Sequence, residues 1–140
     1  MIGSADHYGV VVTDMDTSLA FYRDTLGMEL LDRFEQESEA FGRAVGVADT
    51  KVELAFLDAN GCVVELIDYC QPEGENANDG VDNNDVGAAH FCLAVDDADV
   101  TYERLRGDVP FQSSPQELEN GVKLAFMEDP DGNVVELLEE

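Results

Sequence analysis

The sequence predicts an α+β fold in which one β-α-β-β-β unit occurs twice in tandem. Three pairs of similar segments carry this prediction: residues 7–14 and 90–97, residues 54–56 and 124–126, and residues 61–66 and 132–137. The last pair reads Gly-Cys-Val-Val-Glu-Leu and Gly-Asn-Val-Val-Glu-Leu, so an acidic side chain recurs inside an apolar run. Since such a repeat marks one supersecondary unit used twice, neither half is expected to form a good core alone.

The first unit begins with a β-rich segment and continues into a helical pattern. Asp14 or Asp16 is a suitable N-cap for this helix, and Gly27 suits its C-terminal end. Turn-forming residues at 59–61 then predict a hairpin. The expected elements are a strand at 7–12, a helix at 18–26, a strand at 28–34, a short helix at 38–45, and strands at 51–57 and 62–69.

The second unit repeats this order after a loop at 71–86, which is rich in turn formers and acids. The expected elements are a strand at 90–97, a helix at 98–106, a brief strand at 109–111, and strands at 122–128 and 133–138. The separation of the units is 83 residues at their start (90 − 7) and 71 at their end (136 − 65). The first unit therefore contains about 12 additional residues, most easily placed in 35–50.

The length and composition predict one domain over residues 1–140, with module one at 5–70, a connecting loop at 71–86 and module two at 87–140. About 44% of the residues are apolar, as in ordinary globular proteins. No apolar run approaches the length of a membrane span, and the first residues lack the basic and apolar regions of a signal peptide. The expected location is the cytoplasm.

The charge is strongly acidic, with 32 Asp and Glu against 7 Lys and Arg and a formal net charge of −25. Nucleic acids and anionic membranes are therefore unsuitable partners. An acidic surface of this kind either binds cations and repels anionic substrates, or keeps a protein hydrated in concentrated salt. Because the acids are scattered along the whole chain, we favour a protein from a salt-adapted organism.

Three cysteines, Cys62, Cys70 and Cys92, form no CxxC pair. Their odd number and the lack of a secretion signal predict reduced thiols. Two of them lie within apolar, strand-like runs. We therefore interpret all three as small buried residues.

His7 and His90 are the only two histidines, and they occupy equivalent places in the repeat, as do Glu65 and Glu136. Taken singly, such a histidine is usually a surface or core-edge residue, and a strand glutamate is usually solvated. Taken together, two imidazoles and two carboxylates form an N₂O₂ set of charge −2. This set suits one divalent ion such as Zn, Ni, Co, Mn or Fe, so His7, Glu65, His90 and Glu136 are the predicted metal ligands.

The chain resembles the vicinal oxygen chelate superfamily, which contains glyoxalase I, bleomycin resistance proteins and extradiol dioxygenases. Four segments carry the resemblance: residues 7–12, 19–27, 90–97 and 128–137. It implies paired βαβββ modules that form a half-open, mostly antiparallel, barrel-like sheet around a central metal ion, usually in a homodimer. His7, Glu65, His90 and Glu136 match the ligand positions of the glyoxalase I and methylmalonyl-CoA epimerase types. Dioxygenases need both histidines in one module, which this chain does not offer.

The resemblance implies a metal-dependent lyase or isomerase of glyoxalase I type that removes a proton next to a carbonyl through a metal-bound enediolate. Glu136 is then the expected general base, with Glu65 as its counterpart. The expected small-molecule pocket is mostly apolar and is lined by Leu54, Phe56, Val63, Cys92, Leu124 and Phe126. A methylmalonyl-CoA-type epimerase and a non-catalytic binding or resistance protein are the alternatives.

Two positions depart from the glutathione-using pattern. Val11 stands four residues after His7, where bacterial glyoxalase I has Arg, and Tyr69 stands four residues after Glu65, where it has Asn. Since those groups help to hold glutathione, the thiol that forms the substrate stays open. The identity of the metal ion also stays open, as does the choice between a site within one chain and a site across a dimer.

Overall fold

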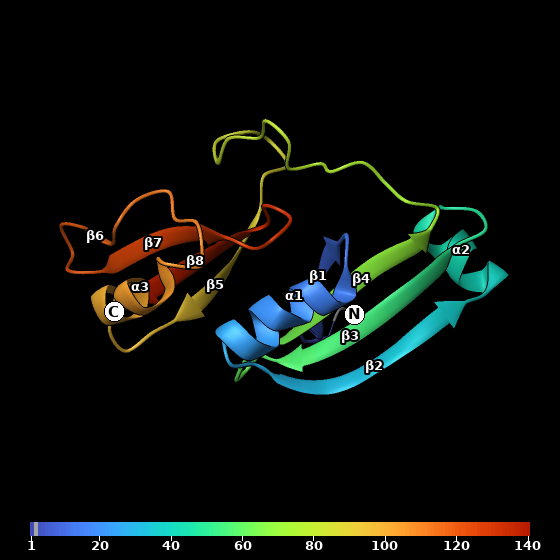
Figure 1. Ribbon diagram of the computed structural model, residues 1–140, viewed down its shortest axis with the longest axis horizontal. Coiled ribbons are helices and arrows are strands. Elements are labelled where there is room, and N and C mark those ends of the chain that lie inside the picture. The colour runs from blue at the N-terminus through green and yellow to red at the C-terminus, as the bar shows by residue number, and fades with distance from the viewer. Residues whose placement is uncertain (2) are drawn as a thin grey trace. The chain divides into compact units, whose positions relative to one another are not determined.

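The computed structural model describes residue 1 and residues 3–140, and it divides the chain into a first unit, 1–75, and a second unit, 76–140. Ile2, which belongs to the N-terminal segment inspected for a signal peptide, lies outside the described residues. Each unit contains one four-stranded mixed sheet with helices (Figure 1). The predicted α+β fold of two βαβββ modules is therefore confirmed, and each sheet is open and does not close into a barrel.

The sheet of the first unit has the strand order β1-β4-β3-β2. Its strands are β1 (His7–Val12), β2 (Glu29–Glu37), β3 (Lys51–Asp58) and β4 (Val63–Gln71). The strand β1 pairs in parallel with β4, whereas the β4–β3 and β3–β2 pairs are antiparallel. The first and last strands of the unit thus lie side by side, with β1 at one edge of the sheet (Figure 1).

The predicted helix after β1 starts earlier than expected. It consists of α1 (Met15–Leu19) and a π-helical turn, η1 (Ala20–Thr25). Asp14 is the N-cap, and its carboxylate accepts a hydrogen bond from the backbone N–H of Thr17 at 2.8 Å. The additional residues of the first unit form α2 (Glu39–Val45), which Ser38 caps at its start. The second unit has no counterpart of α2 among its described residues.

The second unit has the strand order β5-β8-β7-β6 and the same pairing of its first and last strands. Its strands are β5 (His90–Ala94), β6 (Gln116–Glu117), β7 (Lys123–Glu128) and β8 (Val134–Glu139), and its helix is α3 (Ala98–Leu105). Asp97 caps α3 as Asp14 caps α1. The strand β5 pairs in parallel with β8.

The prediction of a brief strand at 109–111 was wrong. Only Phe111 forms an isolated bridge there, with Met127, and the fourth strand is β6, a few residues later. Pro110 has no N–H to donate, and Pro115 immediately precedes β6. The edge of this sheet is therefore broken into two short pieces.

Alternation along the last strand of each unit separates a buried face from the face that carries the acidic residue. Val64 and Leu66 of β4 are fully buried, and so are Val135 and Leu137 of β8. In the first unit, helix α1 contacts β4 and helps to cover this buried face (Figure 1). Successive strand residues point to opposite sides, so Glu65 and Glu136 lie on the other face.

The segment that connects the units is attached to the second unit by amide side chains. Nδ2 of Asn76 and Nδ2 of Asn78 donate to the carbonyl oxygen of Asp131 at 3.0 and 3.1 Å. The buried carboxylate of Asp129 accepts hydrogen bonds from the backbone N–H groups of Asp131 and Asn133 in the same turn. The β7–β8 turn is thereby held immediately before the strand that carries Glu136. Within the described part of the chain, no helix has the length and apolar character needed to cross a membrane.

Candidate metal centre

The first unit brings His7 and Glu65 together. The parallel register of β1 and β4 places Gly9 beside Glu65, and the carboxylate reaches back along β1 to the imidazole. Nε2 of His7 lies 3.0 Å from Oε2 of Glu65. The side chain of Glu65 is only 15% exposed, whereas that of His7 is 37% exposed. A mostly buried carboxylate therefore has a histidine nitrogen as its polar partner.

The second unit repeats this arrangement with His90 and Glu136. The register of β5 and β8 places Cys92 beside Glu136. Nε2 of His90 lies 3.1 Å from Oε2 of Glu136, and the glutamate side chain is 12% exposed. In both units the Nε2 atom and the Oε2 atom face each other, so each unit presents one imidazole nitrogen and one carboxylate in ligand-forming proximity.

An aromatic ring from the third strand packs on each histidine. The ring centroids of His7 and Phe56 are 6.0 Å apart and those of His90 and Phe126 are 5.3 Å apart, both in edge-to-face geometry. Strand register puts Phe56 directly beside Glu65 and Phe126 directly beside Glu136. The other aliphatic residues of the predicted pocket share these faces: Leu54 and Val63 in the first unit and Leu124 in the second.

Sequence reasoning did not single out two residues next to the first pair. Phe34 of β2 stacks on Phe56, with a centroid distance of 6.0 Å. Oδ2 of Asp6 lies 2.8 Å from Nδ1 of His7. The hydrogen bond with Asp6 is the largest cause that raises the pKa of His7 above its usual value, and the charge of Glu65 adds to it. The position of Asp6 directly before a candidate histidine in the sequence was the signal from which its role could have been predicted.

The contact with Asp6 holds the ring of His7, a candidate ligand, in one orientation. The hydrogen bond between Nδ1 and Asp6 leaves Nε2, on the side of Glu65, as the nitrogen that would coordinate an ion. Histidines that bind metal ions commonly have a carboxylate in this position, which fixes the tautomer and the ring orientation. His90 follows Ala89, so no acidic residue directly precedes it.

The four predicted ligands fall into two separate pairs, one in each unit. Among residue 1 and residues 3–140, no group of three or more His, Cys, Asp or Glu side chains lies close enough to hold a metal ion. Each pair by itself supplies one nitrogen and one oxygen. The donor chemistry of the two pairs together, two imidazoles and two carboxylates, fits a borderline divalent ion.

The three cysteines are free, as predicted, but the expectation that they are buried was wrong, because all three are exposed. Cys62 lies in the turn before β4, and Cys70 lies near the end of that strand. Cys92 lies on β5, on the face of the sheet that also carries His90. Periodicity indicates which residues share a face, but it does not show whether that face is covered.

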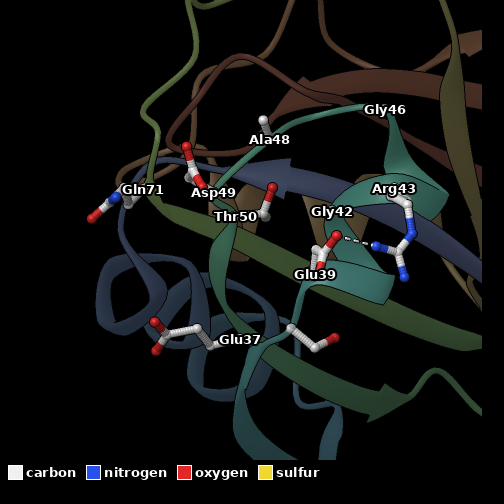
Figure 2. A pocket seen from close by; sticks show the side chains of 10 residues that line it. Glu37, Glu39, Gly42, Arg43, Gly46, Ala48, Asp49, Thr50 and Gln71 are labelled. Carbon is white, nitrogen blue, oxygen red and sulfur yellow. Dashed lines mark hydrogen bonds and ion pairs between the residues drawn. The ribbon is translucent and has the colours of Figure 1, made fainter.

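A separate hollow of about 950 Å³ lies at the far end of the first unit's sheet (Figure 2). Its walls come from the end of β2, from α2 and from the segment that leads into β3, and they include Glu37, Arg43 and Thr50. Arg43 is paired with Glu39, and the hydroxyl of Thr50 donates to the carbonyl of Val47. Neither His7 nor Glu65 lines this hollow, so it is distinct from the candidate metal centre.

The two βαβββ units, each with a histidine on its first strand and a glutamate on its last, define a protein of two tandem modules with one His–Glu pair in each. Residues 4–137 match the sequence profile of the Glyoxalase/Bleomycin resistance protein/Dioxygenase superfamily. The chain belongs to this superfamily.

Relatives and solved structures show the same relationship. The chain is 33% identical over 142 aligned positions to the lactoylglutathione lyase of Salmonella typhimurium, and the alignment covers 95% of this chain and 90% of that protein. The trypanothione-dependent glyoxalase I of Leishmania major has a similar structure, with a TM-score of 0.65 and 29% identity, over 96% of this chain and 84% of that one. A glyoxalase family protein from Bacillus cereus has a similar fold, with a TM-score of 0.88 and 23% identity, over 100% and 95% of the two chains.

Proposed function

We propose that this protein is a divalent-metal-dependent lyase or isomerase of glyoxalase I type, with His7, Glu65, His90 and Glu136 as the metal ligands. The observation that carries the proposal is the repeated His–Glu pair, with Nε2–Oε2 distances of 3.0 and 3.1 Å in two equivalent modules. A divalent ion held by this set supplies Lewis-acid stabilisation of the negative charge that develops on a carbonyl oxygen when the neighbouring carbon loses its proton.

The proposed role of Glu136 is to move that proton. It takes the proton from the carbon that bears the hydroxyl and sulfur of a hemithioacetal and returns it to the adjacent carbonyl carbon, while the hydroxyl proton passes to the oxygen of that second carbon. The product is a 2-hydroxy thioester, so the reaction is an isomerisation without gain or loss of atoms. The side chain of Glu136 is only 12% exposed and lies beside Phe126 in the sheet. Such partly desolvated surroundings strengthen its electrostatic interactions with the reacting atoms.

The chain's own residues do not define the thiol of the proposed hemithioacetal substrate. Val11 lies on the same strand face as His7 and is 57% exposed, so it presents an apolar surface where bacterial glyoxalase I has Arg. Tyr69 lies on the same face of β4 as Glu65. A panel of thiols is therefore the appropriate screen. The proposed centre needs both modules, supplied either by one chain or by the two copies of a homodimer.

The direct test combines metal analysis with a substrate screen. The purified protein should carry or bind one divalent ion per pair of modules and should convert hemithioacetals formed from methylglyoxal and a panel of thiols that includes glutathione. Methylmalonyl-CoA serves as the substrate of the alternative epimerase. Metal binding without turnover of any hemithioacetal, together with epimerisation of methylmalonyl-CoA, would establish the epimerase. Absence of metal binding would contradict both enzymatic functions and favour a binding protein.

We further propose that the protein is adapted to high salt. The many carboxylates behind its formal net charge of −25 repel one another in dilute buffer, and salt screens this repulsion. Several basic side chains already form ion pairs with acids, including Arg33 with Asp16 and Glu53 and Lys123 with Asp99. We expect the midpoint of thermal unfolding to rise as KCl is increased from dilute to molar concentrations, measured by circular dichroism. A midpoint that falls or stays constant over this range would contradict salt adaptation.

A further inference from the structure

Two turns of the protein contain the dipeptide Asn-Gly. Asn60 and Gly61 lie in the turn between β3 and β4, and Asn120 and Gly121 lie in the turn between β6 and β7. In an Asn-Gly pair the backbone nitrogen of the glycine can attack the side-chain carboxamide, because a residue without a Cβ leaves that nitrogen accessible. All four residues are exposed, so exposure does not distinguish the two turns.

Hydrogen bonds engage both reacting groups in the second turn. The backbone N–H of Gly121 donates to the carbonyl oxygen of Leu118 at 2.9 Å. Oδ1 of Asn120 accepts a hydrogen bond from the backbone N–H of Val122 at 3.2 Å. The glycine nitrogen and the asparagine carboxamide therefore have to leave these partners before they can meet, which requires local opening of the turn.

The first turn leaves the same two groups without such restraint. Its backbone is held at one side, where the N–H of Asn60 donates to Oδ1 of Asp58 at 2.7 Å and the N–H of Ala59 donates to the carbonyl of Cys62 at 2.9 Å. In the part of the chain that the structure describes, neither the N–H of Gly61 nor the carboxamide of Asn60 has a hydrogen-bond partner. A Cβ atom at Gly61 would meet no atom within 4 Å, so nothing packs against this backbone.

We propose that Asn60 is a site of spontaneous deamidation in the folded protein, whereas Asn120 is protected. The backbone nitrogen of Gly61 loses its proton and bonds to Cγ of Asn60, and the carboxamide nitrogen leaves as ammonia. The product is a cyclic imide between residues 60 and 61. Water then opens this ring at either of its two carbonyl carbons and leaves aspartate or isoaspartate at the position of Asn60. The reaction needs only water, and it is independent of the proposed metal and substrate.

The modification changes the turn that leads into the strand of Glu65. Either product adds a carboxylate to an already acidic protein, and isoaspartate also inserts one more carbon into the main chain. The turn connects Asp58 and Val63, which are paired in the register of β3 and β4. The extra carbon thus lies directly beside the first pair of this ladder. We therefore expect aged protein to be a mixture of chains that differ at this turn.

The experiment follows both sites in the intact protein. The protein is kept in molar KCl at mildly alkaline pH, in water labelled with a heavy oxygen isotope, and a second sample is unfolded in urea and treated identically. Peptides that contain Asn60 or Asn120 are separated and their masses are measured over time. We expect Asn60 to convert at least about tenfold faster than Asn120 in the folded protein, because two hydrogen bonds of ordinary strength protect Asn120. The two rates should become similar in urea.

Asn60→Gly is the matched control, because glycine suits the positive φ of 59° at this position and carries no carboxamide. It should abolish the mass change at the first turn and leave the rate at Asn120 unaltered. Uptake of the heavy isotope into both aspartate and isoaspartate is the expected sign of ring opening by water.

Four results would overturn the proposal. Equal rates at the two sites of the folded protein would show that hydrogen bonding does not protect Asn120. Conversion of Asn60 only in urea would show that the folded turn holds it as well. An equal preference for Asn60 in both samples would assign the difference to the neighbouring residues and not to the turn. Aspartate without isoaspartate would exclude the cyclic imide. Faster conversion of Asn60 in the folded protein alone, with both products, supports the proposal.

Discussion

Replacement of Glu136 by Gln is expected to lower kcat by roughly 10²- to 10⁴-fold, the usual contribution of a general base. Glutamine has nearly the same shape, so it can occupy the same space beside Cys92 and Phe126. It cannot accept the proton of the substrate as a carboxylate does. Because the lost interaction is with the reacting atoms, kcat and kcat/KM should fall together. Initial rates with a hemithioacetal, measured on protein whose metal content is known, test this expectation.

The matched control is Glu65→Gln, which removes the equivalent carboxylate from the other module. Both variants lose one carboxylate of the proposed ligand set, so they should lose similar metal affinity. The additional loss of kcat in Glu136→Gln then measures its role as base. Equal kcat values in the two variants at saturating metal would contradict the assignment of Glu136, and a larger loss in Glu65→Gln would transfer the role of base to Glu65.

Replacement of either histidine by Ala is expected to abolish tight metal binding. Loss of a partner that only orients a ligand commonly costs 10- to 100-fold in affinity, and loss of the ligand itself should cost more than about 100-fold. His7 and His90 lie in different modules, and each forms the polar contact of a mostly buried glutamate. One shared ion requires both of them. Affinity is measured by titration of the metal-free protein with Co²⁺ or Zn²⁺.

Asp6→Asn is the graded control for this result. It weakens the hydrogen-bond acceptor at Nδ1 of His7 without touching Nε2, so its effect should be smaller than that of His7→Ala. If His90→Ala binds the ion as tightly as the unaltered protein while His7→Ala does not, the ion is held by the first module alone. That outcome would contradict a centre built from both modules.

The repeat in the sequence was sufficient to predict the fold. Matching segments at 7–14 and 90–97 were confirmed as the first strand of each module and the cap of the following helix. The predicted ends of the helices and strands were less accurate, because these ends depend on capping and on pairing partners. The predicted strand at 90–97 ends at Ala94, and the helix predicted at 18–26 begins at Met15 and becomes a π-helix. Nothing in residue periodicity distinguishes these helical forms.

Sequence reasoning proposed four metal ligands but could not say which would be neighbours. That His7 meets Glu65, and His90 meets Glu136, follows from parallel pairing of the first and last strands of each module. Strand order is a property of the tertiary fold and is not contained in the alternation of apolar residues. For the same reason the register that places Cys92 beside Glu136 was not predicted, although Cys92 was included in the pocket.

The parallel pairing has a consequence for folding. His7 and Glu65 are separated by 58 residues (65 − 7), and His90 and Glu136 by 46 (136 − 90). Each pair can form only after the last strand of its module has docked beside the first, and such non-local contacts form slowly. The presence of each His–Glu contact is thus evidence that its module is completely folded. An ion bound by both pairs would favour the state in which both modules are folded at once, and it would therefore stabilise the folded chain as a whole.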